Sequence, residues 1–341
     1  IVSLARSFKN STELFILDKI INDGFFVGDI SLNFDSNGKI KDDYEIKGFI
    51  KNGKLSILKQ YNIKNLNLLF NIKKNQFLLE QINTKFNKIE LSSPSILIKE
   101  KKDLFLFSGK ILSNEKNFNI NLLNNLFKDS FKNIGIKKIK FSSNNEFFFK
   151  FTKKFKISDF SLKSTIDLKN LEYKNDLSKI KDYLPSFNES IKLINHKILI
   201  NYDKKQLNID GNGNILIEDE LDTLNYKIIK KKEQYIFETF ININKNSLFL
   251  DILNYQKKKN INSLISLKGK YKKNKQLKFN LISLKEGKNI FLIKNLDLNN
   301  KFQIISLDTV YLDYINDNEK ENQIELKKYK KDYKINGKIF D

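Results

Sequence analysis

Few residues in this chain could do chemistry. His196 is the only histidine, and there is no cysteine. A disulfide, a thiol nucleophile and a histidine–cysteine metal site are therefore excluded. A serine–histidine–aspartate triad would have to use His196, but no serine stands in the G-x-S-x-G context typical of such a nucleophile. The stretch Ile194–Lys197 places this histidine just before an expected strand, which favours a structural or exposed role.

A glycine- and asparagine-rich run, Asp210-Gly211-Asn212-Gly213-Asn214, resembles the start of a calcium-binding loop. Ile215 then occupies the sixth position, where the loop needs glycine, and Leu221 the twelfth, where it needs a bidentate glutamate. A phosphate-binding loop fails as well, because Leu216 replaces its third glycine. The run therefore predicts a bulged or sharply turning strand connection.

Two pairs of adjacent acids, Asp42-Asp43 and Asp219-Glu220, could suggest acid–base chemistry. Successive residues of a strand face opposite sides, so neither pair would bring two carboxylates together. We interpret them as solvated turn residues. With no other constellation in sight, the sequence predicts no enzyme activity, no metal and no cofactor.

Aromatic residues are densest around Phe147, Phe149 and Phe151, with Phe155 nearby. On a strand, alternate residues share a face, so these rings would lie on one side of one or two strands. Two interpretations stay open, namely ordinary core packing and a lining for lipid acyl chains.

The chain is strongly basic, with 62 Lys and Arg against 40 Asp and Glu and a net charge of +22. Arg6 is the only arginine. A dedicated nucleic-acid reader rarely omits arginine, whose planar fork reads phosphates and base edges. The lysines are also spread along the chain, so we expect no nucleic-acid partner. Such a surface would tolerate, and weakly favour, anionic lipid headgroups.

The elements that must position these residues show a two-residue alternation of apolar and polar side chains, which predicts strands with one apolar face. It recurs from about Phe25 to the end, for example in Gly28–Phe34, Phe240–Asn244 and Leu277–Leu281. Asparagine–glycine pairs suit tight hairpin turns. We expect such turns at residues 37–38, 52–53 and 336–337.

Helical spacing of apolar residues predicts four short amphipathic helices. They are expected at residues 3–22, 122–133, 176–194 with a kink at Pro185, and 246–255. No run of about 18 apolar residues occurs, so no helix is expected to span a bilayer. The predicted fold is mostly β, a long curled antiparallel groove with a few short helices.

The chain starts at Ile1 and contains no methionine. We expect an interior fragment, residues 1–341, of one elongated β-groove domain, with 1–135 and 136–341 as possible sub-units.

Several short segments of the sequence follow one another in a set order: a glycine, a hydrophobic strand, an asparagine–glycine turn and a second strand that begins with glycine. The segments are Gly24–Ile30, Asp35–Gly38, Gly48–Gly53, Ile63–Leu68, Phe86–Leu91, Ile96–Ile98 and Leu104–Gly109. This order resembles the bacterial AsmA-like family, in particular its YhdP- and TamB-type members. The resemblance is best between Gly24 and Lys110.

The resemblance implies a long β-groove with an apolar concave face that carries phospholipid acyl chains. It also implies a periplasmic lipid conduit between the inner and outer membranes, which maintains the cell envelope. The inner-membrane anchor would lie outside this fragment, and envelope proteins could bind at the ends. Apolar contact is non-directional, so a lipid could slide along such a wall.

Two other classes stay open at this point. An outer-membrane β-barrel has strands with similar alternation, although the absence of tryptophan, the helical patches and the mid-strand lysines oppose it. A basic scaffold or nucleic-acid-binding protein is supported only by the net charge.

Overall fold

The computed structural model shows an almost entirely antiparallel β protein, with 80% of residues in strands and 2% in helices. It describes residues 21–39, 41, 43–57, 61–102, 104–118, 120–121, 135–152, 156–174, 190–216, 220–272 and 276–339. Nineteen strands belong to one sheet, which is not closed. The predicted mostly-β class is therefore confirmed.

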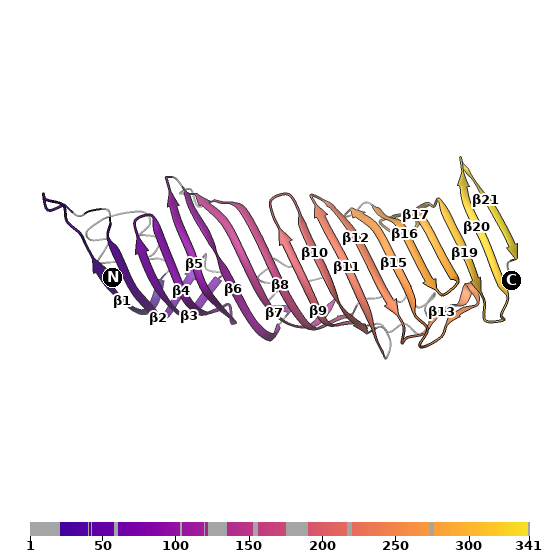
Figure 1. Cartoon of the computed structure of the whole chain (residues 1–341), viewed down its shortest axis with the longest axis horizontal. Helices are drawn as coiled ribbons and strands as arrows, with labels where there is room; N and C mark the ends of the chain where they lie inside the picture. Colours follow the sequence, from indigo (N-terminus) through magenta and orange to yellow (C-terminus); the bar gives the residue numbers. More distant parts are fainter. Residues whose placement is uncertain are drawn as a thin grey trace. The chain divides into compact units, whose positions relative to one another are not determined.

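The chain divides into two compact units. Unit 1 comprises Ile1–Glu115 and Ser142–Ser164, and unit 2 comprises Lys116–Phe141 and Thr165–Asp341. Within each unit, strands that follow one another in the chain lie side by side (Figure 1). The proposed sub-units 1–135 and 136–341 stay a prediction.

The N-terminal strands are long, up to the 18 residues of β8, whereas about six is common in globular proteins. They are β1 (Ile21–Ser31), β2 (Glu45–Ile57), β3 (Tyr61–Lys73), β4 (Gln76–Phe86), β5 (Ile89–Lys101), β6 (Leu104–Phe118), β7 (Ile136–Thr152), β8 (Ile157–Lys174) and β9 (Ser190–Tyr202).

The C-terminal strands continue the same antiparallel order. They are β10 (Leu207–Leu216), β11 (Leu221–Lys231), β12 (Gln234–Ile243), β15 (Ser263–Lys272), β16 (Gln276–Glu286), β17 (Asn289–Asn299), β18 (Ile304–Ser306), β19 (Thr309–Ile315), β20 (Glu321–Tyr329) and β21 (Asp332–Ile339). A separate two-stranded hairpin joins β12 to β15 and consists of β13 (Leu248–Leu250), the one-turn helix η1 (Asp251–Leu253) and β14 (Tyr255–Lys257).

The alternation of side chains produces these strands as expected. In unit 1 Leu66, Leu68, Phe70 and Ile82 form a buried apolar cluster. On the polar side, Glu45 pairs with Lys47 at 2.9 Å and with Lys73 at 3.3 Å. One face of the sheet therefore contains the apolar cluster, and the charges of Glu45, Lys47 and Lys73 lie on the other.

Two of the three predicted asparagine–glycine turns are wrong. Asn52-Gly53 lies within β2, and Asn336-Gly337 lies within β21. The register of β2 against β3 shifts at Gly53, and Asn52 has a φ of 53°, so this pair forms a β-bulge. Asparagine and glycine accept positive φ in bulges as readily as in turns. The chain does reverse at Asn37-Gly38, where the Gly38 amide donates to the Asp35 carbonyl at 3.0 Å.

Only parts of the predicted helices at residues 3–22 and 176–194 overlap the described residues. Residues 122–133 lie outside the described residues, as do residues 3–20 and most of 176–194. The C-terminal end of the first helix is wrong, because Ile21 begins β1. The end of the third is also wrong, because Ser190 begins β9. No helix of the described residues is long and apolar enough to cross a membrane.

The predicted helix at 246–255 is wrong. Leu248–Leu250 pairs with Tyr255–Lys257 as an antiparallel hairpin, and only Asp251–Leu253 form a helical turn. Asn254 closes this turn with a φ of 44° and donates its amide to the Asp251 carbonyl at 2.9 Å. Packing against the sheet prevails over the helical spacing of the apolar residues.

Candidate functional site

The apolar face of unit 2 consists of continuous rows of side chains that run across the strands. In an antiparallel pair, residues directly opposite each other share a face. One row crosses eight neighbouring strands, from β11 to β21, with apolar side chains and a terminal glycine. Its members, each opposite the next, are Leu224, Ile241, Ile265, Leu284, Phe291, Leu312, Ile324 and Gly337.

A second row runs beside the first and begins one strand earlier. Its members are Gly211, Tyr226, Thr239, Leu267, Ile282, Ile293, Val310, Leu326 and Ile335. Neither row contains a charged residue. Together the two rows form a continuous apolar surface, in which Thr239 is the one aliphatic position with a hydroxyl group.

The opposite face of unit 2 bears charges of both signs. Lys227 lies 3.8 Å from Asp210, and Lys268 lies 3.5 Å from Glu238. These pairs are exposed and contribute little stability. These charges lie on the side of the sheet away from the two apolar rows.

Unit 1 has an equivalent apolar row across its first six strands. Its members are Ile30, Ile46, Ile72, Phe77, Ile98 and Phe107. Beside it, Phe26 stacks on Phe70 with ring centroids 5.0 Å apart. Ile30 is 63% exposed at the edge strand, so this row reaches the border of the described sheet.

The predicted aromatic site belongs to this face. Phe149 stacks on Phe107 at 4.7 Å, Phe151 meets Phe107 edge-on at 6.1 Å, and Phe147 lies 5.9 Å from Phe149. All four rings are half-buried. The structure therefore brings Phe147, Phe149 and Phe151 together with a ring from β6. The fourth predicted residue, Phe155, lies outside the described residues.

His196 lies inside β9, not before it, and is 2% exposed. Its ring covers Gly213 of β10, where a β-carbon would come within 2.4 Å of the ring. Its Nε2–H donates to the Asn214 carbonyl at 2.8 Å, and burial lowers its pKa. The strand connection predicted at residues 210–214 is wrong, because this run lies inside β10 in unbroken register with β11. The register shift between Asn212 and Asn214 is a bulge of the partner strand β9, where Asn195 has a φ of 53°. His196 is thus a packing residue of a bulged strand pair.

Tyr226 lies beside this histidine on the apolar face, with ring centroids 5.8 Å apart. Its ring lies over Gly211, and burial raises the pKa of its hydroxyl to about 12. Tyr226 therefore stays protonated and neutral at any physiological pH.

The β13–β14 hairpin covers one end of the unit 2 apolar face. Tyr255 of the hairpin packs with Leu284, Phe291 and Tyr314 of the sheet in one buried cluster. Three hairpin leucines, Leu248, Leu250 and Leu253, join the cluster from above. The Tyr314 hydroxyl donates to the Leu253 carbonyl at 2.9 Å, and burial raises the pKa of Tyr314.

Buried polar groups hold this hairpin in place. Lys257 is fully buried, and its Nζ donates to the carbonyls of Asn244 at 2.7 Å and Asn246 at 2.6 Å. Burial lowers the pKa of this lysine, and nearby Asp222 opposes the shift. The Asp222 carboxylate accepts from the amides of Asn244 and Lys245 and from the Asn246 side chain.

A further contact joins the hairpin to the turn after β16. The Tyr255 hydroxyl donates to the Glu286 carboxylate. Burial raises the pKa of Glu286, against the opposing effect of its hydrogen bond with Asn289. Sequence inspection missed this whole arrangement, because nothing in the spacing of these residues shows that distant turns meet.

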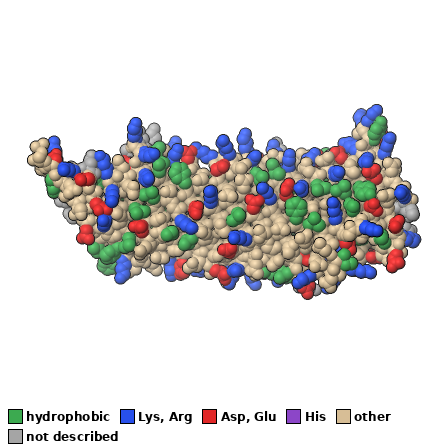
Figure 2. Space-filling model, in the orientation of Figure 1, with side chains coloured by type: hydrophobic (Ala, Val, Ile, Leu, Met, Phe, Trp, Pro, Cys, Tyr) green, Lys and Arg blue, Asp and Glu red, His purple; other side chains and the backbone are tan. Residues whose placement is uncertain are grey.

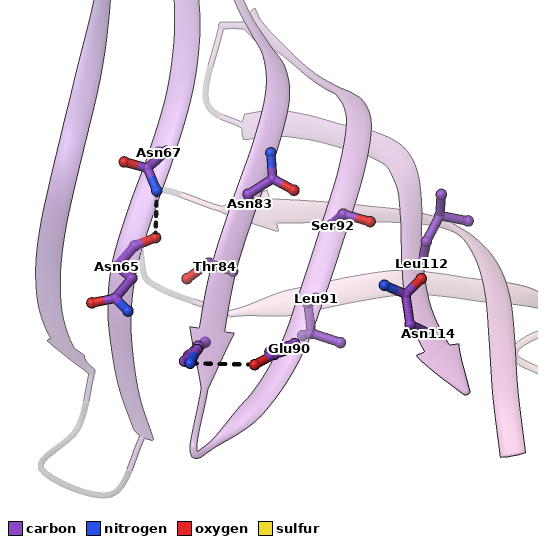
Figure 3. Close-up of a pocket in the computed structure, with 10 residues that line it drawn as sticks. Asn65, Asn67, Asn83, Thr84, Glu90, Leu91, Ser92, Leu112 and Asn114 are labelled. Atoms are coloured by element: carbon purple, nitrogen blue, oxygen red, sulfur yellow. Dashed lines mark hydrogen bonds and ion pairs between the residues drawn. The ribbon is translucent and has the colours of Figure 1, made fainter. Parts of the chain in front are cut away.

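A polar pocket of about 300 Å³ lies over β3 to β6 of unit 1 (Figure 3). Its asparagines are engaged in holding bulges. Asn67 donates to the Asn65 carbonyl at 3.0 Å, Asn83 donates to the Gln81 carbonyl at 3.2 Å, and both carbonyl residues have positive φ. Lys85 and Glu90 pair at 3.2 Å across its rim. We interpret this pocket as a consequence of the bulges.

Among the described residues, no three His, Cys, Asp or Glu side chains gather closely enough to hold a metal ion. Of the two pairs of adjacent acids, Asp42 and Asp219 lie outside the described residues. Both pairs therefore stay predicted turn residues. The apolar face is the most extensive candidate site.

Comparison of the chain with family models, with curated proteins and with solved structures found no match. The resemblance to AsmA-like proteins therefore stays a prediction.

Proposed function

We propose that this chain binds phospholipids by their acyl chains on its apolar face and passes them along that face. The observation that carries the proposal is the eight-strand row from Leu224 to Gly337. At about 4.8 Å per strand, such a row extends roughly 34 Å. The apolar side chains of this row are buried or half-buried, and the β13–β14 hairpin covers Leu284 and Phe291 among them. A continuous apolar face of this length needs a cover along the rest of the row.

These apolar rows need a cover that excludes water. Burying apolar surface contributes about 25 cal/mol per Å², whether the cover is protein or lipid. An acyl chain is a suitable cover, because apolar contact has no preferred direction. A lipid that moves along the face exchanges its contacts with one row for similar contacts with the next, at little cost in free energy. The bulges at Asn52 and Asn195 bend their strands, which supports a curled, groove-like sheet as part of this proposal.

The biological setting is part of the same proposal and is supported by the AsmA-like resemblance. In it, the protein is a lipid conduit in the periplasm that serves the inner and outer membranes and maintains the cell envelope. An anchor and envelope protein partners would involve regions outside this sequence. Phospholipid is the ligand, and no nucleic acid is required.

Site-specific photocrosslinking tests the binding face. Benzoylphenylalanine replaces Ile241 or Phe149 on the apolar faces, and Asn242 or Glu146 as matched neighbours on the opposite faces. Each protein is incubated with vesicles of phosphatidylethanolamine and phosphatidylglycerol, illuminated and weighed by mass spectrometry. We expect lipid adducts at 241 and 149 and few at 242 and 146. Equal labelling of both faces, or no labelling, would contradict the proposal.

A further inference from the structure

The two ends of the unit 2 strands differ in a way that gives a bound lipid a direction. At one end, the β13–β14 hairpin lies over Leu284 and Phe291. At the other end, the row nearest the turns combines three tyrosines and one lysine with three leucines. Its members are Tyr202, Leu207, Lys230, Tyr235, Tyr271, Leu277 and Leu298.

This row, the tyrosine row, lies on the same face as the apolar rows. Two of its rings, Tyr235 and Tyr271, lie 6.2 Å apart, and the Lys230 ammonium lies 5.3 Å from the Tyr235 ring. Tyr202 is 39% and Tyr271 40% exposed. Tyrosine has an apolar body and a polar tip, so it favours boundaries between hydrocarbon and water.

Beyond the tyrosine row, the turns at the same strand ends are rich in lysine. The exposed residues of this lysine rim are Lys204, Lys205, Lys231, Lys232, Lys272, Lys301, Lys328, Lys330 and Lys331. The acids in the same turns are Asp203, Glu233 and Asp332. Figure 2 shows lysine side chains gathered at the tip of the β20–β21 hairpin, at the upper right of the view.

The opposite strand ends have no such excess of positive charge among the described residues. The turn after β19 contains Asp317, Glu319 and Lys320, and Glu321 follows it. The turn after β16 contains Lys288 next to buried Glu286. Charge, aromatic rings and apolar cover are therefore ordered along the strands, from the lysine rim to the hairpin.

We propose that unit 2 binds anionic phospholipids in one orientation, with the phosphate headgroup at the tyrosine row and lysine rim and the acyl chains extending toward the β13–β14 hairpin. This inference rests on the proposed lipid-binding function and adds the headgroup class and the orientation. The lysines attract the phosphate, the tyrosines contact the glycerol region, and the hairpin leucines close the far end.

Two photoreactive phosphatidylglycerols test the orientation on the full chain. One has its diazirine on the headgroup and the other at the end of an acyl chain. We expect the headgroup probe to label peptides around Lys230–Tyr235, and the chain-end probe to label the hairpin around Leu250–Leu253. Labelling in the reverse order, or of both regions by both probes, would overturn the orientation while leaving lipid binding intact. If neither probe labelled the protein, the proposed lipid binding itself would be contradicted.

Matched lysine variants test the headgroup class. The rim variant is K231Q/K232Q/K272Q, and the control is K258Q/K259Q/K288Q, which removes the same number of exposed charges at the hairpin end. Loading from phosphatidylglycerol vesicles should fall at least about tenfold in the rim variant, since each lysine near an anionic surface contributes about fivefold. Loading from phosphatidylcholine vesicles should be unchanged. An equal loss in both variants, or none in either, would contradict a specific headgroup site.

Discussion

At the residue scale, glycines within the strands are covered by aromatic rings from neighbouring strands. The Tyr226 ring occupies the space that a β-carbon on Gly211 would need, and the Phe70 ring does the same at Gly48. A ring over a glycine fills the place where the strand has no side chain of its own. The apolar face thus stays continuous across its glycines.

His196 makes the stability of the protein depend on pH. Burial lowers its folded-state pKa below the usual value of 6.5, so the folded state disfavours the proton. The stabilisation is complete above pH 6.5 and is lost as the pH falls through 6.5 toward the folded-state pKa. We expect the free energy of unfolding, measured in urea, to decrease between pH 7.5 and 5.5.

The H196Q variant is the control for this effect, because its amide can still donate to the Asn214 carbonyl but does not titrate. Its unfolding free energy should change less over the same pH interval. An identical pH dependence in both proteins would show that other groups are responsible.

At the element scale, the β13–β14 hairpin is fixed by a buried lysine, Lys257, that donates to the backbone carbonyls of Asn244 and Asn246 near the charge of Asp222. Removing Lys257 as K257A would leave the carbonyls of Asn244 and Asn246 and the Asp222 charge without their cation. Leaving these two carbonyls without a donor costs about 3 kcal/mol in total. We expect K257A to lower the free energy of unfolding by about this amount and to expose the hairpin to limited proteolysis.

K259A is the matched control, because Lys259 is exposed in the same connection. Its effect should lie within about 0.5 kcal/mol of zero. If K257A were as stable and as protease-resistant as K259A, the hairpin would not depend on its buried lysine.

The strands could be predicted from the sequence, but their faces could not. Leu277, Phe279 and Leu281 alternate perfectly in the sequence. The register shift at Asn280 puts Phe279 opposite Gly269 and Leu281 opposite Lys268. Ile282 therefore replaces Leu281 on the apolar face. A single bulge exchanges the two faces of a strand, and sequence alone does not show where asparagine bulges a strand or turns a chain.

The hairpin shows a second limit of sequence reasoning. Leu248, Phe249, Ile252 and Leu253 have helical spacing, which is a local signal. Their structure depends instead on Phe291 and Tyr314, which lie more than thirty residues away. By contrast, the grouping of Phe147, Phe149 and Phe151 could be predicted, because it depends only on alternation within one strand.

At the scale of the whole molecule, we propose that lipid covers the apolar face of the sheet. The large positive charge of the chain gains a role in this account, since in unit 2 the lysine rim lies at one end of the apolar rows. Binding of lipid by an apolar face needs no catalytic group.

Native mass spectrometry with lipid extraction, on the chain purified without detergent, tests this claim most directly. The account predicts several phospholipids per chain, enriched in anionic headgroups. A monomer that is free of lipid and remains soluble would contradict it, because its apolar rows would then need no lipid cover.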